Sequence, residues 1–93
     1  MSVTIKDFYA DWCGPCETQD PILEEISEEW GDQCDIEKID VDEQQDVANE
    51  YHVRSLPTLV IEQDGEIVDR FVGVTPRDDI EDSLQDAGLQ QLS

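Results

Sequence analysis

Two cysteines separated by two residues constrain this chain more than any other feature of its sequence. Residues 12–16 read Trp-Cys-Gly-Pro-Cys and directly follow a strand-like run. The proline between the thiols indicates that a helix begins here, because proline at the first helical position loses no hydrogen bond that would otherwise form. The first sulfur would then lie over unpaired backbone N–H groups at the positive end of the helix dipole, which stabilise the thiolate that attacks disulfides. The pattern predicts reversible disulfide chemistry.

A structural zinc site is the main alternative interpretation of the two thiols, besides chance. Zinc usually takes four ligands. A second Cys-x-x-Cys or a His pair is absent from the sequence, so a zinc site would have to recruit Cys34 and His52 from scattered positions. We therefore expect no metal and no cofactor.

The length of the chain predicts one small domain over residues 1–93, with a single core. No run of about 18 apolar residues is present to span a membrane, and the first residues lack the basic-then-apolar pattern of a secretory signal. Three cysteines, two of them in the motif, do not make the disulfide framework of a secreted scaffold. We expect a monomer in the cytoplasm that does not bind membranes.

The charge balance is extreme, with 25 acidic residues against 5 basic ones and a formal net charge of −20. This charge makes nucleic acid an unexpected partner. It also repels itself and destabilises the compact state in dilute buffer, a cost that salt screening relieves. The composition resembles that of proteins from salt-accumulating haloarchaea; the alternative is an ordinary acidic domain that meets a basic partner.

Hydrophobic spacing and turn residues predict an alternation of strands and helices. Apolar residues at three- and four-residue spacings mark an amphipathic first helix that ends at Gly31, Asp42 is expected to cap the second helix, and Pro76 to start the third. Asp64-Gly65 is a strong two-residue hairpin signal. The predicted strands cover residues 3–10, 34–41, 58–62 and 66–72, and the predicted helices cover residues 16–30, 43–51 and 76 to about 88. The order βαβαββα implies an α/β fold with a four-stranded mixed sheet flanked by helices.

Several segments resemble the thioredoxin family in order and approximate spacing. They are Asp7-Phe8-Tyr9-Ala10-Asp11-Trp12-Cys13-Gly14-Pro15-Cys16, then Pro21, Lys38-Ile39-Asp40-Val41-Asp42, Leu56-Pro57-Thr58 and Phe71-Val72-Gly73. The resemblance implies a thioredoxin-like fold. It also shows a departure, because a full-length thioredoxin carries an additional N-terminal strand and helix. The chain therefore looks like a short, glutaredoxin-like, archaeal-type version of the fold.

The resemblance also implies a division of labour among four residues. Cys13 would be the exposed nucleophile that forms a mixed disulfide with a target, and Cys16, deeper in the helix, would resolve it. Asp7 matches the buried carboxylate of the family that takes the proton of the second thiol, and Lys38 matches the lysine that pairs with this carboxylate. From the residues alone, ordinary charges at strand ends are the favoured interpretation of Asp7 and Lys38, and the resemblance reverses this preference.

A substrate-binding patch follows from the same resemblance. Pro57 matches a cis-proline that faces the active-site sulfurs, whereas a proline at the first residue of a strand is the alternative. The expected patch comprises Trp12, Gly14, Pro15, Leu56, Pro57, Gly73 and Val74. On so acidic a protein, an apolar patch is a natural docking surface.

These observations predict an enzyme, a protein disulfide oxidoreductase that reduces disulfides in client proteins through Cys13 and Cys16. A separate disulfide reductase or a small thiol would supply its electrons. The alternatives are a glutaredoxin-like electron donor dedicated to one enzyme, and a thioredoxin-fold module that binds partners or carries a metal without catalysis. Cys34 is expected to face inward as a small apolar residue, and His52 to lie at the surface.

Overall fold

The structure, a computed structural model, describes residues 2–90. Its elements are β1 (Val3–Tyr9), α1 (Gly14–Trp30), the short 3₁₀ turn η1 (Gly31–Gln33), β2 (Cys34–Asp40), α2 (Gln45–Glu50), β3 (Thr58–Gln63), β4 (Glu66–Val72) and α3 (Arg77–Asp86). The predicted order βαβαββα and the four-stranded mixed sheet are both confirmed. The first described strand leads directly into the cysteine motif.

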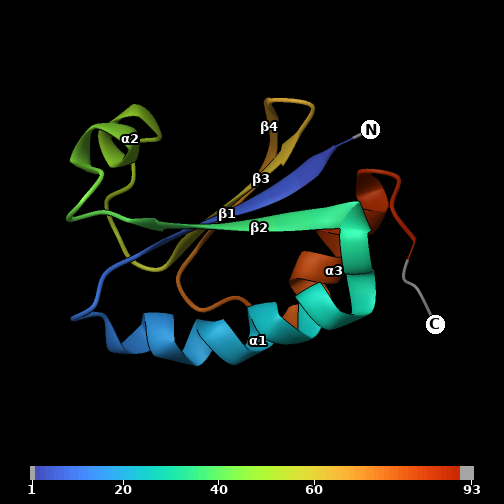
Figure 1. Cartoon of the computed structure of the whole chain (residues 1–93), viewed down its shortest axis with the longest axis horizontal. Coiled ribbons are helices and arrows are strands. Elements are labelled where there is room, and N and C mark those ends of the chain that lie inside the picture. Colours follow the sequence, from blue (N-terminus) through green and yellow to red (C-terminus); the bar gives the residue numbers. More distant parts are fainter. Residues whose placement is uncertain (1, 91–93) are drawn as a thin grey trace.

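The sheet has the strand order β2-β1-β3-β4, so β1 and β3 are its central strands. β1 runs parallel to β2 and antiparallel to β3, and β3 runs antiparallel to β4. Figure 1 shows α1 and α3 on one face of the sheet and α2 on the other, close to the end at which α1 begins. The end of β1 and the start of α1 therefore meet at one end of the molecule, where the cysteine motif lies.

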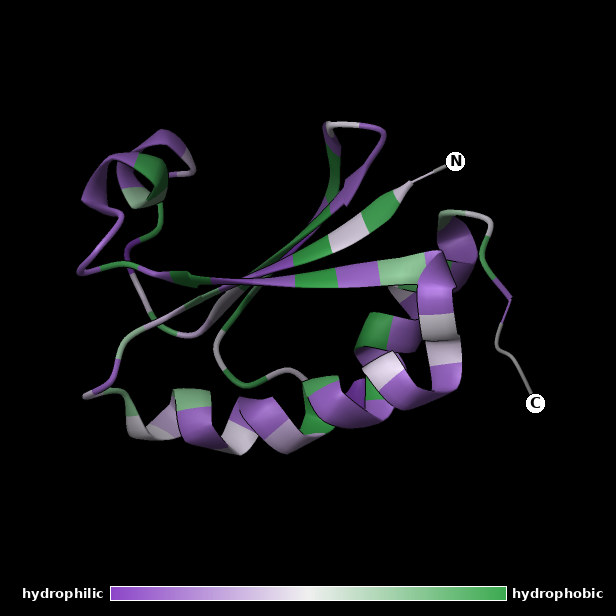
Figure 2. Ribbon diagram, viewed as in Figure 1, coloured by the Kyte–Doolittle hydropathy of each residue, from purple (hydrophilic) through white to green (hydrophobic). Residues whose placement is uncertain are grey.

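Alternation along β1 divides the core between the two faces of the sheet. Val3 and Ile5 are buried with Trp30 and Leu84 in the cluster under α1 and α3. Phe8 points the other way and is fully buried in the cluster on the α2 side. Figure 2 shows hydrophobic residues along the strands, whereas much of α1 is hydrophilic, as expected for a helix with one face in solvent.

All three helices begin one or two residues from their predicted starts, and α3 begins at Arg77 with Pro76 as its N-cap. α1 begins at Gly14 rather than Cys16, because Cys13 itself occupies the N-cap position. α2 begins at Gln45 with no side-chain cap, so the expected capping role of Asp42 is wrong. The turn is instead held by Asp40, whose Oδ1 accepts hydrogen bonds from the backbone N–H groups of residues 42 and 43.

The hairpin between β3 and β4 forms where the sequence predicted it. Asp64 and Gly65 both have positive φ, at 52° and 87°. These angles match the type I′ turns that Asp-Gly pairs favour, because glycine reaches positive φ without a steric penalty.

Candidate active site: a disulfide at the start of helix α1

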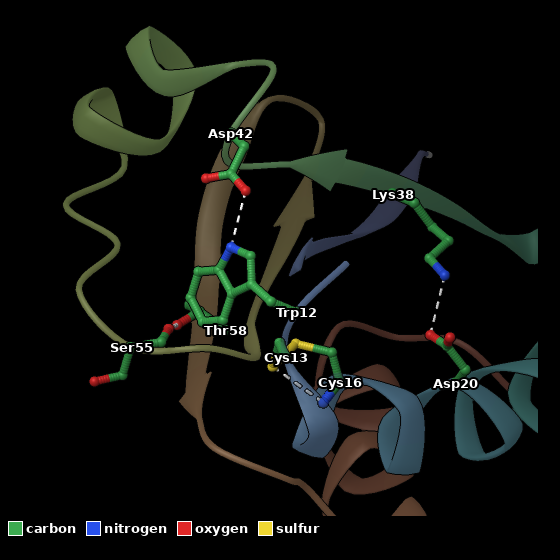
Figure 3. The surroundings of a disulfide bond; sticks show 8 residues. All are labelled: Trp12, Cys13, Cys16, Asp20, Lys38, Asp42, Ser55 and Thr58. Carbon is green, nitrogen blue, oxygen red and sulfur yellow. Dashed lines mark hydrogen bonds and ion pairs between the residues drawn. A yellow bond between two sulfur atoms is a disulfide. The ribbon is translucent and has the colours of Figure 1, made fainter. Parts of the chain in front are cut away.

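Cys13 and Cys16 are joined by a disulfide at the first turn of α1. Cys13 is the N-cap residue, and its Sγ accepts a hydrogen bond of 3.2 Å from the backbone N–H of Cys16 (Figure 3). Pro15 lies in the first turn of the helix, as the motif predicted. The helix therefore directs a free N–H group and its positive dipole end at the sulfur of Cys13.

The two sulfurs differ less in burial than the sequence led us to expect. Both Cys13 and Cys16 are 4% exposed, so the expectation of an exposed Cys13 and a more deeply buried Cys16 is wrong for this oxidised form. The physical reason is packing: the disulfide brings the two sulfurs together, and they form a small cluster with Ala10, against which Val41 and Leu56 pack. An incoming sulfur must therefore approach through the residues around Cys13.

Trp12 is the most exposed large hydrophobic residue beside the disulfide, with 70% of its surface accessible. Its indole N–H donates a hydrogen bond of 2.9 Å to Oδ2 of Asp42, which follows β2 (Figure 3). This bond fixes the indole although the ring is in solvent. Sequence reasoning missed the role of Asp42, because it lies 30 residues away along the chain.

The Leu56-Pro57 peptide bond is cis, as the resemblance implied. Pro57 is buried, and its carbonyl oxygen accepts a hydrogen bond of 2.8 Å from the N–H of Gly73. This bond ties the loop before β3 to the segment after β4. The predicted patch residues Leu56, Pro57 and Gly73 are thus brought together by backbone contacts.

The rest of the predicted patch is at the surface. Gly14 and Pro15 are exposed in the first turn of α1, and Val74 is exposed beyond β4. A shallow cleft beside Trp12 and Leu56 adds residues that the sequence did not single out, namely Val41, Val53 and Arg54. Only the fold assembles this cleft, because its residues come from three separate segments.

Asp7 is 1% exposed on central strand β1, and within residues 2–90 neither of its carboxylate oxygens has a hydrogen-bond partner. Burial raises its pKa from 3.8 to about 6; the positive charge of Lys38 lowers this pKa and the negative charge of Asp20 raises it. A carboxyl group in this state can accept a proton near neutral pH.

Lys38 lies opposite Asp7 in the pairing of β1 with β2. Its ammonium group, however, forms an ion pair with Asp20 of α1 at 3.0 Å and lies 4.7 Å from the centre of the Tyr9 ring. The structure thus differs from the expected Asp7–Lys38 pair. The half-exposed Asp20 lets the ammonium remain hydrated, whereas pairing inside the core would require its desolvation.

A second cleft opens on the other side of the disulfide. It is lined by Tyr9, Ala10, Asp11, Cys16, Glu17, Asp20 and Lys38. The ion pair of Lys38 with Asp20 therefore borders the surface next to Cys16. The cleft reaches Cys16, which is 4% exposed.

Cys34 and His52 are the remaining candidate ligands. Cys34 is buried opposite Val3, at the other end of β1, and burial raises the pKa of its thiol to about 11. His52 is exposed just after α2. Across residues 2–90, no group of three or more His, Cys, Asp or Glu side chains could hold a metal ion. Over the same residues, none of the helices has the length and apolar character that a membrane span requires.

Comparison with known proteins places these features in a family. The thioredoxin family profile matches residues 2–86. The chain is 48% identical to the thioredoxin of Bacillus subtilis over 80 residues, which are 86% of this chain and 77% of that protein.

Solved structures of thioredoxins have the same fold. A mutant thioredoxin from Halobacterium salinarum superposes with a TM-score of 0.84 at 41% identity, covering 99% of this chain and 79% of that one. Oxidised mitochondrial thioredoxin 3 from Saccharomyces cerevisiae gives a TM-score of 0.83 at 34% identity, covering 91% and 78%. The dedicated electron donor and the non-catalytic module are not favoured by these relatives. With its disulfide at the start of α1, the chain belongs to the thioredoxin family and is a thiol-disulfide oxidoreductase that reduces disulfides in client proteins.

Proposed function

We propose that Cys13 is the nucleophile, Cys16 the resolving thiol and Asp7 the proton acceptor of this oxidoreductase. The observation that carries the proposal is the position of Cys13. The residue follows the exposed Trp12, its sulfur caps α1, and Leu56, whose bond to Pro57 is cis, packs against the cysteine cluster. A sulfur at this position is stabilised as a thiolate by the helix.

The reaction follows from this arrangement in two exchanges. The Cys13 thiolate attacks one sulfur of the client disulfide, the client S–S bond breaks, and the other client sulfur leaves as a thiolate that takes up a proton. Cys16 then gives its proton to Asp7, and its thiolate attacks the sulfur of Cys13 in the mixed disulfide. The Cys13–Cys16 disulfide forms, and the client leaves with two electrons gained.

Asp7 suits this second step because it is buried, has no competing hydrogen bond within residues 2–90 and has a pKa raised to about 6. A base with a pKa near the working pH accepts and returns a proton efficiently. Lys38 would act on Asp7 through its charge from the opposite position on β2, while its own ion pair is with Asp20.

Clients would bind across a docking surface formed by Trp12, Gly14, Pro15, Leu56, Pro57, Gly73 and Val74. The exposed apolar groups of Trp12 and Val74 would contact client side chains, and the backbone next to Pro57 and Gly73 would bind an extended client segment. Exposed carboxylates at Asp11, Glu17 and Asp42 surround this surface. Clients and the electron donor would therefore carry basic or salt-adapted surfaces.

A separate disulfide reductase or a small thiol would return two electrons to the Cys13–Cys16 disulfide after each cycle. We place this cycle in the cytoplasm, with the protein as a monomer. The net charge of −20 supports a salt-rich setting, and the relative from Halobacterium salinarum is consistent with it. Neither nucleic acid nor membrane has a place in this scheme.

The experiment that tests the assignment separates the two exchanges. Cys16→Ser should capture a protein client as a stable mixed disulfide, because Cys13 can still attack but nothing resolves the product. Cys13→Ser should capture none, and Cys34→Ser, in a protein that keeps both motif cysteines, should turn over normally. Asp7→Asn should slow release of the mixed disulfide more than its formation. Equal slowing of both steps, or capture by Cys13→Ser, would contradict the assigned roles.

A further inference from the structure

Gln19 is an unusual polar residue on the inner face of α1. It lies three residues after Cys16, and none of its surface is accessible to solvent. Its Nε2 donates a hydrogen bond of 3.1 Å to the carbonyl oxygen of Thr75, and its Oε1 accepts one of 2.7 Å from the Thr75 N–H. A single side-chain amide thus satisfies both backbone groups of one residue in the segment between β4 and α3. Figure 1 shows this segment running beside α1.

The segment fixed by Gln19 continues into the docking surface. Thr75 is itself buried, and its hydroxyl donates a hydrogen bond of 3.0 Å to the carbonyl oxygen of Gly73. The N–H of Gly73 donates in turn to the carbonyl oxygen of Pro57. A continuous set of hydrogen bonds therefore runs from the helix that holds the disulfide, through Thr75 and Gly73, to the cis-proline loop.

Loss of these hydrogen bonds would destabilise the segment that contains Gly73 and Val74. Without Gln19, the N–H and the carbonyl of Thr75 would be buried with no partner, and a buried unsatisfied backbone group is costly. The segment would relieve this cost by moving towards water. Because Val74 is half-exposed next to Thr75, its side chain would move with it.

We propose that Gln19 is a positioning residue for client binding. It fixes the position of residues 73–75 relative to α1, and this position determines the shape of the docking surface around Cys13. The inference rests on the proposed function, in that residues 73 and 74 contact the client. The hydrogen bonds of Gln19 go to Thr75 and not to the sulfurs, and its buried side chain is not part of the docking surface. Its effect is therefore on the binding of extended protein clients, and not on the reactivity of the disulfide.

The test compares a protein client with a small disulfide. Gln19→Met keeps the length and helix propensity of the side chain but removes both hydrogen bonds. With insulin as the protein disulfide, we expect the KM of Gln19→Met to be about fivefold higher than that of the parent protein. A change of this size corresponds to the net free energy of roughly one hydrogen bond. We expect kcat to change by less than about twofold. The rate with a small aromatic disulfide, which reaches Cys13 without residues 73–75, should remain that of the parent protein. Gln19→Asn, whose amide is one methylene too short for both contacts, should raise the KM in the same way.

Gln33 provides a matched control. It also contacts a backbone carbonyl and a backbone N–H of one residue, Gln90, but it follows α1 at the end away from the disulfide. Gln33→Met should therefore leave the KM and kcat for insulin, and the rate with the small aromatic disulfide, unchanged. In Gln19→Met, hydrogen exchange at the N–H groups of Thr75 and Gly73 should accelerate by more than about tenfold, which is the direct sign that the segment has been released.

Each remaining outcome overturns a different statement. If Gln19→Met leaves the KM for insulin unchanged while Val74→Ser raises it, the docking surface stands and the role of Gln19 is wrong. If neither variant changes this KM, the docking surface and the inference both fail. If Gln19→Met slows the small aromatic disulfide as much as insulin, Gln19 acts on the thiols or on the whole fold, and the positioning role is overturned.

Discussion

Asp7 is a single buried residue whose charged form lowers the stability of the fold. Its carboxyl group is buried on a central strand, and within residues 2–90 neither oxygen has a hydrogen-bond partner. The nearest compensation, the charge of Lys38, is shared with Asp20. Buried charges without hydrogen bonds oppose folding. This carboxyl group therefore does not hold the fold together, which agrees with the proton transfer proposed for it.

We expect Asp7→Asn to stabilise the protein above about pH 6. The folded-state pKa of Asp7 is raised from 3.8 to about 6, so protonated Asp7 favours folding below about pH 4 and this contribution is lost as the pH rises through about 6. A shift of about two pKa units corresponds to about 3 kcal/mol, which is the upper limit of the expected gain. Urea unfolding in molar KCl, at about pH 4 and again at about pH 8, measures it.

The control for this prediction is Asp46→Asn, because Asp46 is an exposed carboxylate on α2 and its loss removes the same charge. Asp46→Asn should change the free energy of unfolding little at either pH. A gain from Asp7→Asn that is the same at both pH values would mean that the Asp7 carboxyl titrates normally in the folded protein.

At the scale of elements, Arg77 connects α3 to α1 through several carboxylates. Its guanidinium lies 3.2 Å from Glu25 and 3.4 Å from Glu81, and it also contacts Glu29. The indole N–H of Trp30 donates a hydrogen bond of 3.1 Å to the same Glu81. The first turn of α1 therefore carries the disulfide, whereas side chains on its last turns bind α3.

We expect Arg77→Met to lower the melting midpoint, because three carboxylates on two packed helices would then repel one another without a cation between them. The loss should be largest in dilute buffer and should shrink in molar KCl, where screening weakens this repulsion. Thermal unfolding followed by circular dichroism measures it. Arg54→Met is the matched control, since it removes the same charge from an exposed loop position. If both variants lower the melting midpoint equally, Arg77 stabilises the protein only through its contribution to the net charge.

At the scale of the whole molecule, the −20 charge and the small core oppose each other. A chain of 93 residues must hold this charge together with the apolar clusters on the two faces of the sheet. The five basic residues cannot neutralise the 25 acids, although three of them take part in salt bridges. Self-repulsion of this kind weakens with ionic strength.

We expect the melting midpoint to rise steeply from dilute buffer to molar KCl. Screening shortens the range of repulsion to about 3 Å at 1 M salt, so most of the gain should appear below that concentration. Replacing the exposed Glu24 and Glu28 of α1 by lysine should reduce the amount of KCl that is needed. A midpoint that stays constant across the KCl series would remove the argument for a salt-rich setting.

The fold could be predicted because its signals are local. Apolar periodicity and the Asp64-Gly65 turn specify which segments are strands and helices, and the Cys13-Gly14-Pro15-Cys16 run specifies the start of α1 to within two residues. The cis bond before Pro57 required the family resemblance, because nothing in the residue order alone distinguishes it from a proline at the start of a strand.

The sequence by itself therefore determined the order of elements, the sheet and the pair of thiols. The tertiary structure alone decided how side chains from distant segments meet: Lys38 pairs with Asp20, Asp42 holds the indole of Trp12, and Gln19 binds Thr75. It also decided that Cys13 is as buried as Cys16 in the disulfide form. The physical reason is that periodicity and turn chemistry depend on neighbours along the chain, whereas these contacts depend on which surfaces packing brings within hydrogen-bond distance.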